Sequence, residues 1–96
     1  MQITWQSLAG MIDHTNLRPE ATREQINRLC DEARELGFAA VVVNPCYVTL
    51  AHSRLEESKV KVATVVGFPL GATLTSVKRF EAEEALQLGA GELIWC

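Results

Sequence analysis

Polar side chains that could do chemistry gather in three stretches of this 96-residue sequence, each beside an apolar run. Asp13 lies in the first, Asn44 opens the second, and the third is the glycine-rich segment Gly67–Thr73. A carboxylate can accept and return a proton, and an amide can hydrogen-bond a substrate hydroxyl. Two plainer roles compete: Asp13 would serve equally well as a structural cap, and Asn44 before Pro45 is a common start of a turn.

The first stretch, Ile12–Leu17, predicts a short strand with polar side chains at alternate positions. In a strand, successive side chains point to opposite faces, so Asp13 and Thr15 face one way and His14 the other. A carboxylate on the inner face of an ordinary sheet would be out of place. In a barrel whose interior ends in a pocket, a functional acid would lie there.

Other kinds of site find little support. Gly67–Ala72 lacks the Gly-Lys-Ser/Thr ending of a nucleotide-binding P-loop. His14, His52 and Cys46 do not have the spacing of zinc ligands, and we expect no metal and no cofactor.

The positions of the three lysines argue against imine formation by this chain. Lys59 and Lys61 precede or begin a predicted strand, and Lys78 falls in the first turn of a predicted helix. An amine nucleophile must be desolvated in a pocket to react near neutral pH. We therefore expect no lysine of this chain to form a Schiff base.

The elements that position these groups follow from apolar periodicity and from capping signals. Thr22 and Gln25 form a capping-box pattern, and Gly37 and Gly89 are helix terminators. Strands are predicted over residues 12–17, 38–43, 60–66 and 92–96, and helices over about 3–11, 23–36, 49–57 and 75–88. The predicted inward stripes are Ile26, Leu29, Cys30, Ala33 and Leu36 in the second helix, Leu50, Ala51 and Leu55 in the third, and Val77, Phe80, Ala85 and Leu88 in the fourth.

This order, an N-terminal helix and then β-α-β-α-β-α-β, predicts an α/β fold with parallel strands and right-handed crossovers. Four strands and three connecting helices make half of a (β/α)₈ TIM barrel. An open flavodoxin-like sheet is the alternative. The length allows a single domain, residues 1–96.

Composition narrows the class of protein further. The net charge is −3 and the pI is near 5.3, which argues against nucleic acid as a partner. There is no apolar run of membrane-spanning length and no secretory leader pattern, and the three cysteines suit reduced thiols. We expect a cytoplasmic protein that does not bind membranes.

Three motifs taken together closely resemble deoxyribose-phosphate aldolase: Ile-Asp-His-Thr-Asn-Leu-Arg-Pro from Ile12, Val-Asn-Pro-Cys-Tyr-Val from Val43, and Val-Ala-Thr-Val-Val-Gly-Phe-Pro-Leu-Gly from Val62. The resemblance extends to about Leu93 and concerns the N-terminal half of the family's chain. It implies a (β/α)₈ class I aldolase, a carbon–carbon lyase without a metal. Such enzymes interconvert 2-deoxyribose 5-phosphate with glyceraldehyde 3-phosphate and acetaldehyde.

Carried over by position, the resemblance implies that Asp13 is an auxiliary proton-relay residue and that Thr15 and Asn44 contact the substrate. The family's second catalytic aspartate is replaced here by Ile94, and its Schiff-base lysine belongs to later strands. One deleted base after the codon of Leu93 would convert Leu-Asp-Met-Val into Leu-Ile-Trp-Cys. We therefore expect a truncated or frameshifted aldolase that is inactive, or nearly so, by itself.

Two functions from different classes follow, and a third is weaker. The first is an aldolase fragment acting on a sugar phosphate or an aldehyde. The second is a non-enzymatic half-barrel that pairs its exposed strand edges with a second copy, as a homodimer or larger oligomer. The third is a module that retains part of a sugar-phosphate pocket.

Overall fold

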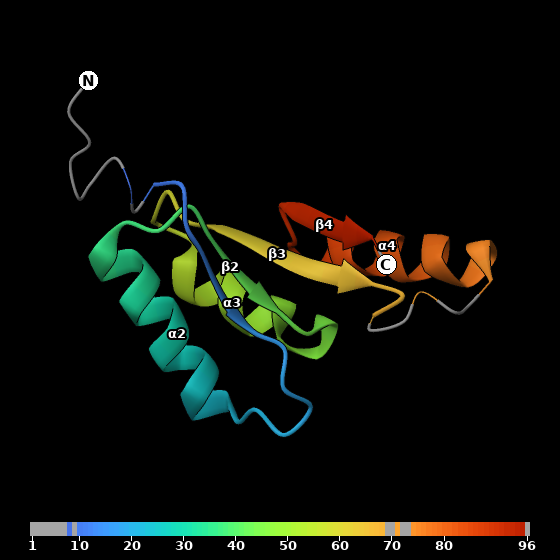
Figure 1. The fold of residues 1–96 in the computed structure, drawn as a ribbon, viewed down its shortest axis with the longest axis horizontal. Helices are drawn as coiled ribbons and strands as arrows, with labels where there is room; N and C mark the ends of the chain where they lie inside the picture. The colour runs from blue at the N-terminus through green and yellow to red at the C-terminus, as the bar shows by residue number, and fades with distance from the viewer. Residues whose placement is uncertain (1–7, 9, 69–70, 72–73, 96) are drawn as a thin grey trace.

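The structure, a computed structural model, describes residues 8, 10–68, 71 and 74–95 (Figure 1). Its elements are β1 (Asp13–Asn16), α2 (Arg23–Leu36), β2 (Ala40–Val43), the 3₁₀ turn η1 (Pro45–Tyr47), α3 (Val48–Leu55), β3 (Lys61–Val66), α4 (Thr75–Leu88) and β4 (Glu92–Trp95). The predicted elements are present with ends shifted by at most two residues. The helix predicted over 3–11 falls mostly outside the described residues.

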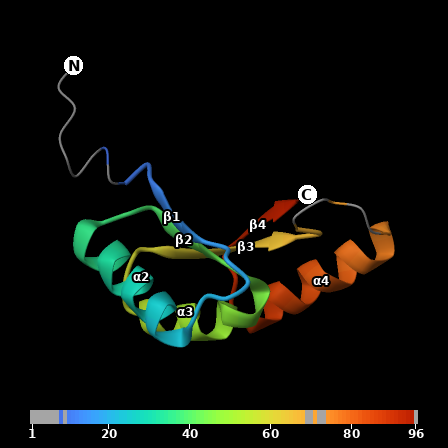
Figure 2. The ribbon, with the colours of Figure 1, turned by 60° about the horizontal axis from the view of Figure 1, so that its bottom comes forward.

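All four strands are parallel and lie in the order β1-β2-β3-β4. The three helices cover the same face of the sheet, and the opposite face carries no helix among the described residues (Figure 2). A flavodoxin-like sheet would break the sequential strand order and place helices on both faces. The fold is therefore a half of a (β/α)₈ barrel, and the helix-free face, here called the concave face, corresponds to the inside of the barrel.

Helix α2 forms as its sequence predicts. The Thr22 hydroxyl accepts a hydrogen bond from the Gln25 N–H at 3.2 Å, and the Gln25 side chain accepts one from the Thr22 N–H at 3.0 Å. Ile26, Leu29, Cys30 and Ala33 are buried as predicted, whereas Leu36 is exposed because it lies in the last turn, beside the terminator Gly37. The inward stripe predicted for α3 holds, with Ala51 and Leu55 buried and Leu50 packed against the core.

The inward stripe predicted for α4 is mostly wrong. Ala85 is buried as predicted, but Val77 and Phe80 are 46% and 64% exposed, and Leu88 is exposed as well. Ala82, which was not predicted, is buried instead. Small side chains on the inward side let the helix backbone approach the sheet closely, and the larger apolar groups are left outside.

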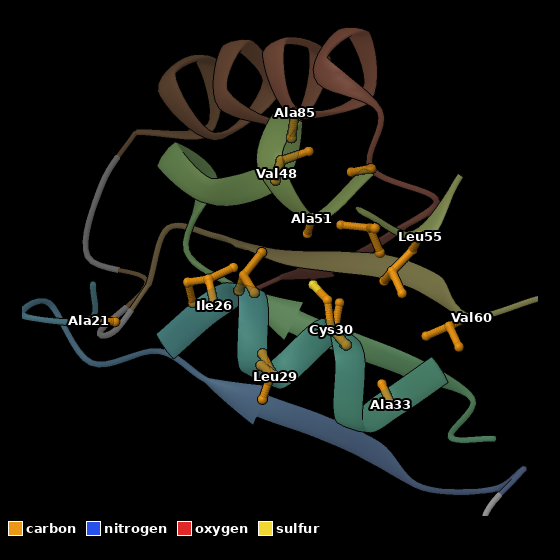
Figure 3. Close-up of a cluster of buried hydrophobic side chains, with 14 residues drawn as sticks. Ala21, Ile26, Leu29, Cys30, Ala33, Val48, Ala51, Leu55, Val60 and Ala85 are labelled. Carbon is orange, nitrogen blue, oxygen red and sulfur yellow. The ribbon is translucent and has the colours of Figure 1, made fainter. Parts of the chain in front are cut away.

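The core lies on both sides of the sheet. Between sheet and helices, the strand residues Val41, Val43 and Val62 pack with buried side chains from α2 and α3 such as Ile26 and Leu55 (Figure 3). On the concave face a smaller buried cluster contains Val42, Ala63 and Val65, with Leu17 packed against it. In the described part of the chain, no helix is long and apolar enough to span a membrane.

Cys30 lies within this core, on α2. Burial, helped by the nearby Asp31 carboxylate, raises the pKa of the Cys30 thiol from an ordinary value of 9.0 to about 11. A protonated, enclosed thiol is a packing group and not a nucleophile. Cys46, by contrast, is exposed.

Two helix-terminating glycines provide a matched pair for testing how the fold is held. Both have positive φ, 73° at Gly37 and 114° at Gly89. A methyl group on Gly37 would meet nothing within 4 Å, whereas one on Gly89 would lie 2.6 Å from Cγ of His52. We expect Gly37→Ala to cost about 1 kcal/mol and Gly89→Ala roughly 2–4 kcal/mol, measured by urea unfolding. In a His52→Ala background, Gly89→Ala should cost less free energy of unfolding than it does in the parent. The same cost of Gly89→Ala in both backgrounds would contradict this packing.

The buried thiol predicts an alkaline loss of stability. Above pH 9 the unfolded chain releases the Cys30 proton while the native state retains it, so the free energy of unfolding falls as the pH rises towards 11. The fall due to this group should be on the order of 2–3 kcal/mol. Urea unfolding between pH 8 and 11 should show it in the parent and in Cys46→Ala, but not in Cys30→Ala. The same slope in all three chains would refute the assignment.

Candidate functional site

The strand register decides which side chains share the concave face. Asp13 is level with Ala40 and Lys61, and Thr15 is level with Val42 and Ala63. Since side chains alternate along each strand, Asp13 and Thr15 lie on the concave side with the buried Val42 cluster. His14 lies on the other side, where its ring contacts Phe38 edge-on. The predicted orientation of Asp13 and Thr15 is thus confirmed.

Asp13, Thr15 and Asn16 all lie within β1, inside the strand predicted over Ile12–Leu17. Asp13 is the first residue of β1, at the amino end of the sheet, and the loop begins at Leu17. Asp13 and Thr15 are both exposed, open to the concave side.

Three hydrogen bonds organise the loop after β1, at the carboxyl end of the sheet. The Asn44 amide donates to the Arg18 carbonyl at 3.2 Å, and the Tyr47 hydroxyl donates to the Ala21 carbonyl. Within the loop, the Arg18 N–H donates to the Asn16 side chain at 3.2 Å. Asn44 also precedes Pro45 in the 3₁₀ turn, so it is a turn residue and a loop anchor at once.

The loop after β3 has its own anchor from α4. The Gly67 N–H donates to Oε2 of Glu81 at 3.4 Å, and the Gly71 N–H donates to the Gly67 carbonyl at 2.7 Å. Both glycines have positive φ, near 70°, which accounts for glycine at these positions. Residues 69–70 and 72–73 of the predicted glycine-rich segment lie outside the described residues.

Sequence reasoning did not single out Tyr47 or Glu81 as supports of the site. Tyr47 follows Pro45 by two residues, and an aromatic hydroxyl there is a recognisable candidate for a hydrogen bond back to a neighbouring loop. Glu81 gave no such signal, because its partner is a backbone N–H that only the packing of α4 brings near.

Two of the three lysines lie at the amino end of β3, and the third lies on a helix. Lys61 begins β3, is largely exposed, and lies 3.6 Å from the Glu92 carboxylate. Lys59 precedes that strand and is exposed, and Lys78 lies near the start of α4. That no lysine of this chain forms an imine stays a prediction.

A separate groove of about 300 Å³ lies between β1 and α2, on the helix-covered side. Its lining includes His14 and Glu32, whose Nε2 and Oε2 atoms are 3.3 Å apart, and the apolar side chain of Leu29. Within the described ranges, no group of three or more His, Cys, Asp or Glu side chains could hold a metal ion.

Comparison with known proteins gives one consistent name. No protein-family model matches the chain. Deoxyribose-phosphate aldolases from Thermoanaerobacter sp. (strain X514), Clostridium kluyveri and Thermococcus gammatolerans are 55%, 58% and 61% identical to it over 87 or 88 residues. These alignments include 90–92% of this chain but only 39–40% of each relative.

Solved structures agree with the sequence matches. A putative deoxyribose-phosphate aldolase from Coccidioides immitis superimposes with a TM-score of 0.93 at 45% identity, over 97% of this chain and 37% of its own. The Aeropyrum pernix deoxyribose phosphate aldolase, described as a unique tetrameric structure, gives 0.89 at 39% identity, over 96% of this chain and 39% of its own. By sequence and by fold, the chain matches deoxyribose-phosphate aldolases as a fragment, and it spans about two-fifths of the length of the relatives it matches.

Proposed function

We propose that this chain supplies one wall of an active site that cleaves 2-deoxyribose 5-phosphate into glyceraldehyde 3-phosphate and acetaldehyde. The observation that carries the proposal is the placement of Asp13 and Thr15 on the concave face, beside the Val42 cluster. The inside of a (β/α)₈ barrel is where a substrate would meet residues from several strands. The name that the relatives share, deoxyribose-phosphate aldolase, supports the choice of this reaction.

Each of the three site residues has a role that its chemistry allows. The Asp13 carboxylate takes and returns a proton as the carbon–carbon bond breaks, and it forms no bond to carbon. The Thr15 hydroxyl hydrogen-bonds the substrate from the same face of β1. The Asn44 amide nitrogen carries two hydrogens, of which the bond to Arg18 uses one, so it can also donate to a substrate hydroxyl.

We propose further that these residues do not suffice without additional strands. A class I aldolase forms an imine between a lysine amine and the substrate carbonyl, and that amine must be held desolvated. Lys61 is largely exposed and lies 3.6 Å from the Glu92 carboxylate, so its amine is not held desolvated. A proton-relay residue by itself typically raises the rate of a reaction by only about 10²- to 10⁴-fold.

A second candidate function is non-enzymatic self-assembly. It is favoured by the concave face, where the apolar Ile94 side chain of β4 is 43% exposed while Val42 and Val65 are 3% exposed. An apolar surface whose side chains are buried at the centre but exposed at one edge favours contact of that edge with another polypeptide.

The aldolase proposal predicts inactivity alone and activity by complementation. The purified chain should show no retro-aldol turnover of 2-deoxyribose 5-phosphate, and borohydride should trap no imine on its lysines. Co-expression with the remaining part of the Thermococcus gammatolerans relative should restore turnover, with the trapped lysine on the added polypeptide. Turnover by the isolated chain with an imine on Lys59, Lys61 or Lys78 would overturn the division of roles.

The two aspartates of the chain provide a matched test of the proton relay. In the complemented assembly, Asp13→Asn should lower kcat by about 10²- to 10⁴-fold, because the concave carboxylate is lost. Asp31→Asn is the control, because Asp31 lies on α2 and pairs with Arg54 at 2.7 Å on the helix side. Equal activity of the two variants would exclude Asp13 from the reaction.

A further inference from the structure

Thr64 is the one fully buried polar residue in the part of the chain that the structure describes. It lies on β3, level with Val43 on β2 and with Leu93 on β4. Val43 belongs to the core under the helices, and Leu93 packs against that core. A hydroxyl in such surroundings costs free energy unless it is hydrogen-bonded, and valine has nearly the same shape without that cost. Packing alone therefore does not account for a threonine at this position.

The hydrogen-bond partner of Thr64 is a main-chain group at the end of the neighbouring strand. The Thr64 hydroxyl donates to the Val43 carbonyl at 2.7 Å, and Val43 is the last residue of β2, directly before Asn44. Side chains alternate along β3, and Ala63 and Val65 lie in the concave-face cluster, so the Thr64 hydroxyl lies on the helix side. It cannot contact a substrate on the concave face, and its influence there passes through the backbone of β2.

We infer that Thr64 is a positioning residue. Its hydroxyl fixes the carboxyl end of β2 and thereby sets the direction in which Asn44 presents its side-chain amide. This inference rests on the proposed function, in which the Asn44 amide donates a hydrogen bond to a substrate hydroxyl. Thr64 touches no reacting group, and it acts on Asn44 only through the peptide group that joins Val43 to Asn44.

The backbone is held by hydrogen bonds on both sides of Asn44. The Val43 carbonyl, in the peptide group before Asn44, accepts from Thr64. The Asn44 carbonyl, in the peptide group after it, accepts from the Tyr47 N–H at 2.9 Å. With both peptide groups fixed, Asn44 retains only its side-chain torsions, which the 3.2 Å bond to the Arg18 carbonyl restricts in turn. The bond from Thr64 is buried and the bond to Arg18 is exposed, so water competes less for the former.

Amide hydrogen exchange in the isolated chain, measured by NMR, is the first test. Thr64→Val removes the donor and should speed exchange of the Tyr47 amide roughly two- to tenfold, because the carbonyl partner of that amide is less firmly held. Thr64→Ser keeps the hydroxyl and should exchange like the parent. Val62→Ala is the matched control: Val62 is buried on the same face of β3 and makes no part of this bond. Its Tyr47 amide should exchange at the parent's rate.

Steady-state kinetics of the complemented assembly test the inference at the site itself. Thr64→Val should raise KM for 2-deoxyribose 5-phosphate roughly two- to tenfold with little change in kcat, because a binding contact is misdirected. Thr64→Ser should keep the parent's KM. A residue that acted only on stability would lower the amount of active assembly and leave KM unchanged. In an Asn44→Ala background, Thr64→Val should have no further effect on KM, because the contact through which it acts is already absent.

Three results would overturn the inference. The first is a Tyr47 exchange rate in Thr64→Val equal to that of the parent, and the second is the same acceleration in Val62→Ala. The third is a full effect of Thr64→Val on KM in the Asn44→Ala background, which would show that the hydroxyl acts elsewhere. An assembly without turnover, combined with faster Tyr47 exchange in Thr64→Val alone, would contradict the aldolase proposal and support the role of Thr64 at the end of β2.

Discussion

One-sided coverage of the parallel sheet is the constraint on which the rest of this structure depends. Crossovers between neighbouring parallel strands have one strongly preferred hand. The strand order here never reverses, so α2, α3 and α4 all pack on the same face (Figure 2). The other face is left concave, with small and β-branched residues at its centre. The same geometry therefore produces a sheet with a large helix-covered core on one face and a smaller buried cluster on the other.

Hydrogen bonds fix the positions of the loops at the carboxyl end of the sheet. Asn44 and Tyr47, in the turn that follows β2, donate hydrogen bonds to the carbonyls of Arg18 and Ala21 in the preceding loop. The next loop is held from the outside, by Glu81 of α4. Such bonds fix the backbone without using the strands' inward side chains, which stay free for substrate or for packing.

The sequence predicted the order, type and approximate limits of the elements because local signals are strong here. The capping box at Thr22 and the terminator Gly89 need no tertiary context. The inward face of α4 was misassigned because apolar residues surround the helix, and close packing selected Ala82 in preference to Phe80. The register that sets Asp13 level with Ala40 and Lys61 could not be predicted, since it depends on pairing with β2 and β3, which no local pattern encodes.

Residue 94 links the two proposals physically. The family resemblance implies an aspartate at this concave position, where it would face the reaction chamber, but this chain has isoleucine. A carboxylate enclosed between two sheets without a partner would oppose their association strongly, because its desolvation costs free energy. Isoleucine has no such desolvation cost, and it adds apolar surface beside Val65 whose burial is favourable. An isoleucine at position 94, where the resemblance implies an aspartate, thus favours covering that part of the concave face, whereas the Asp13 carboxylate on β1 keeps the opposite part polar.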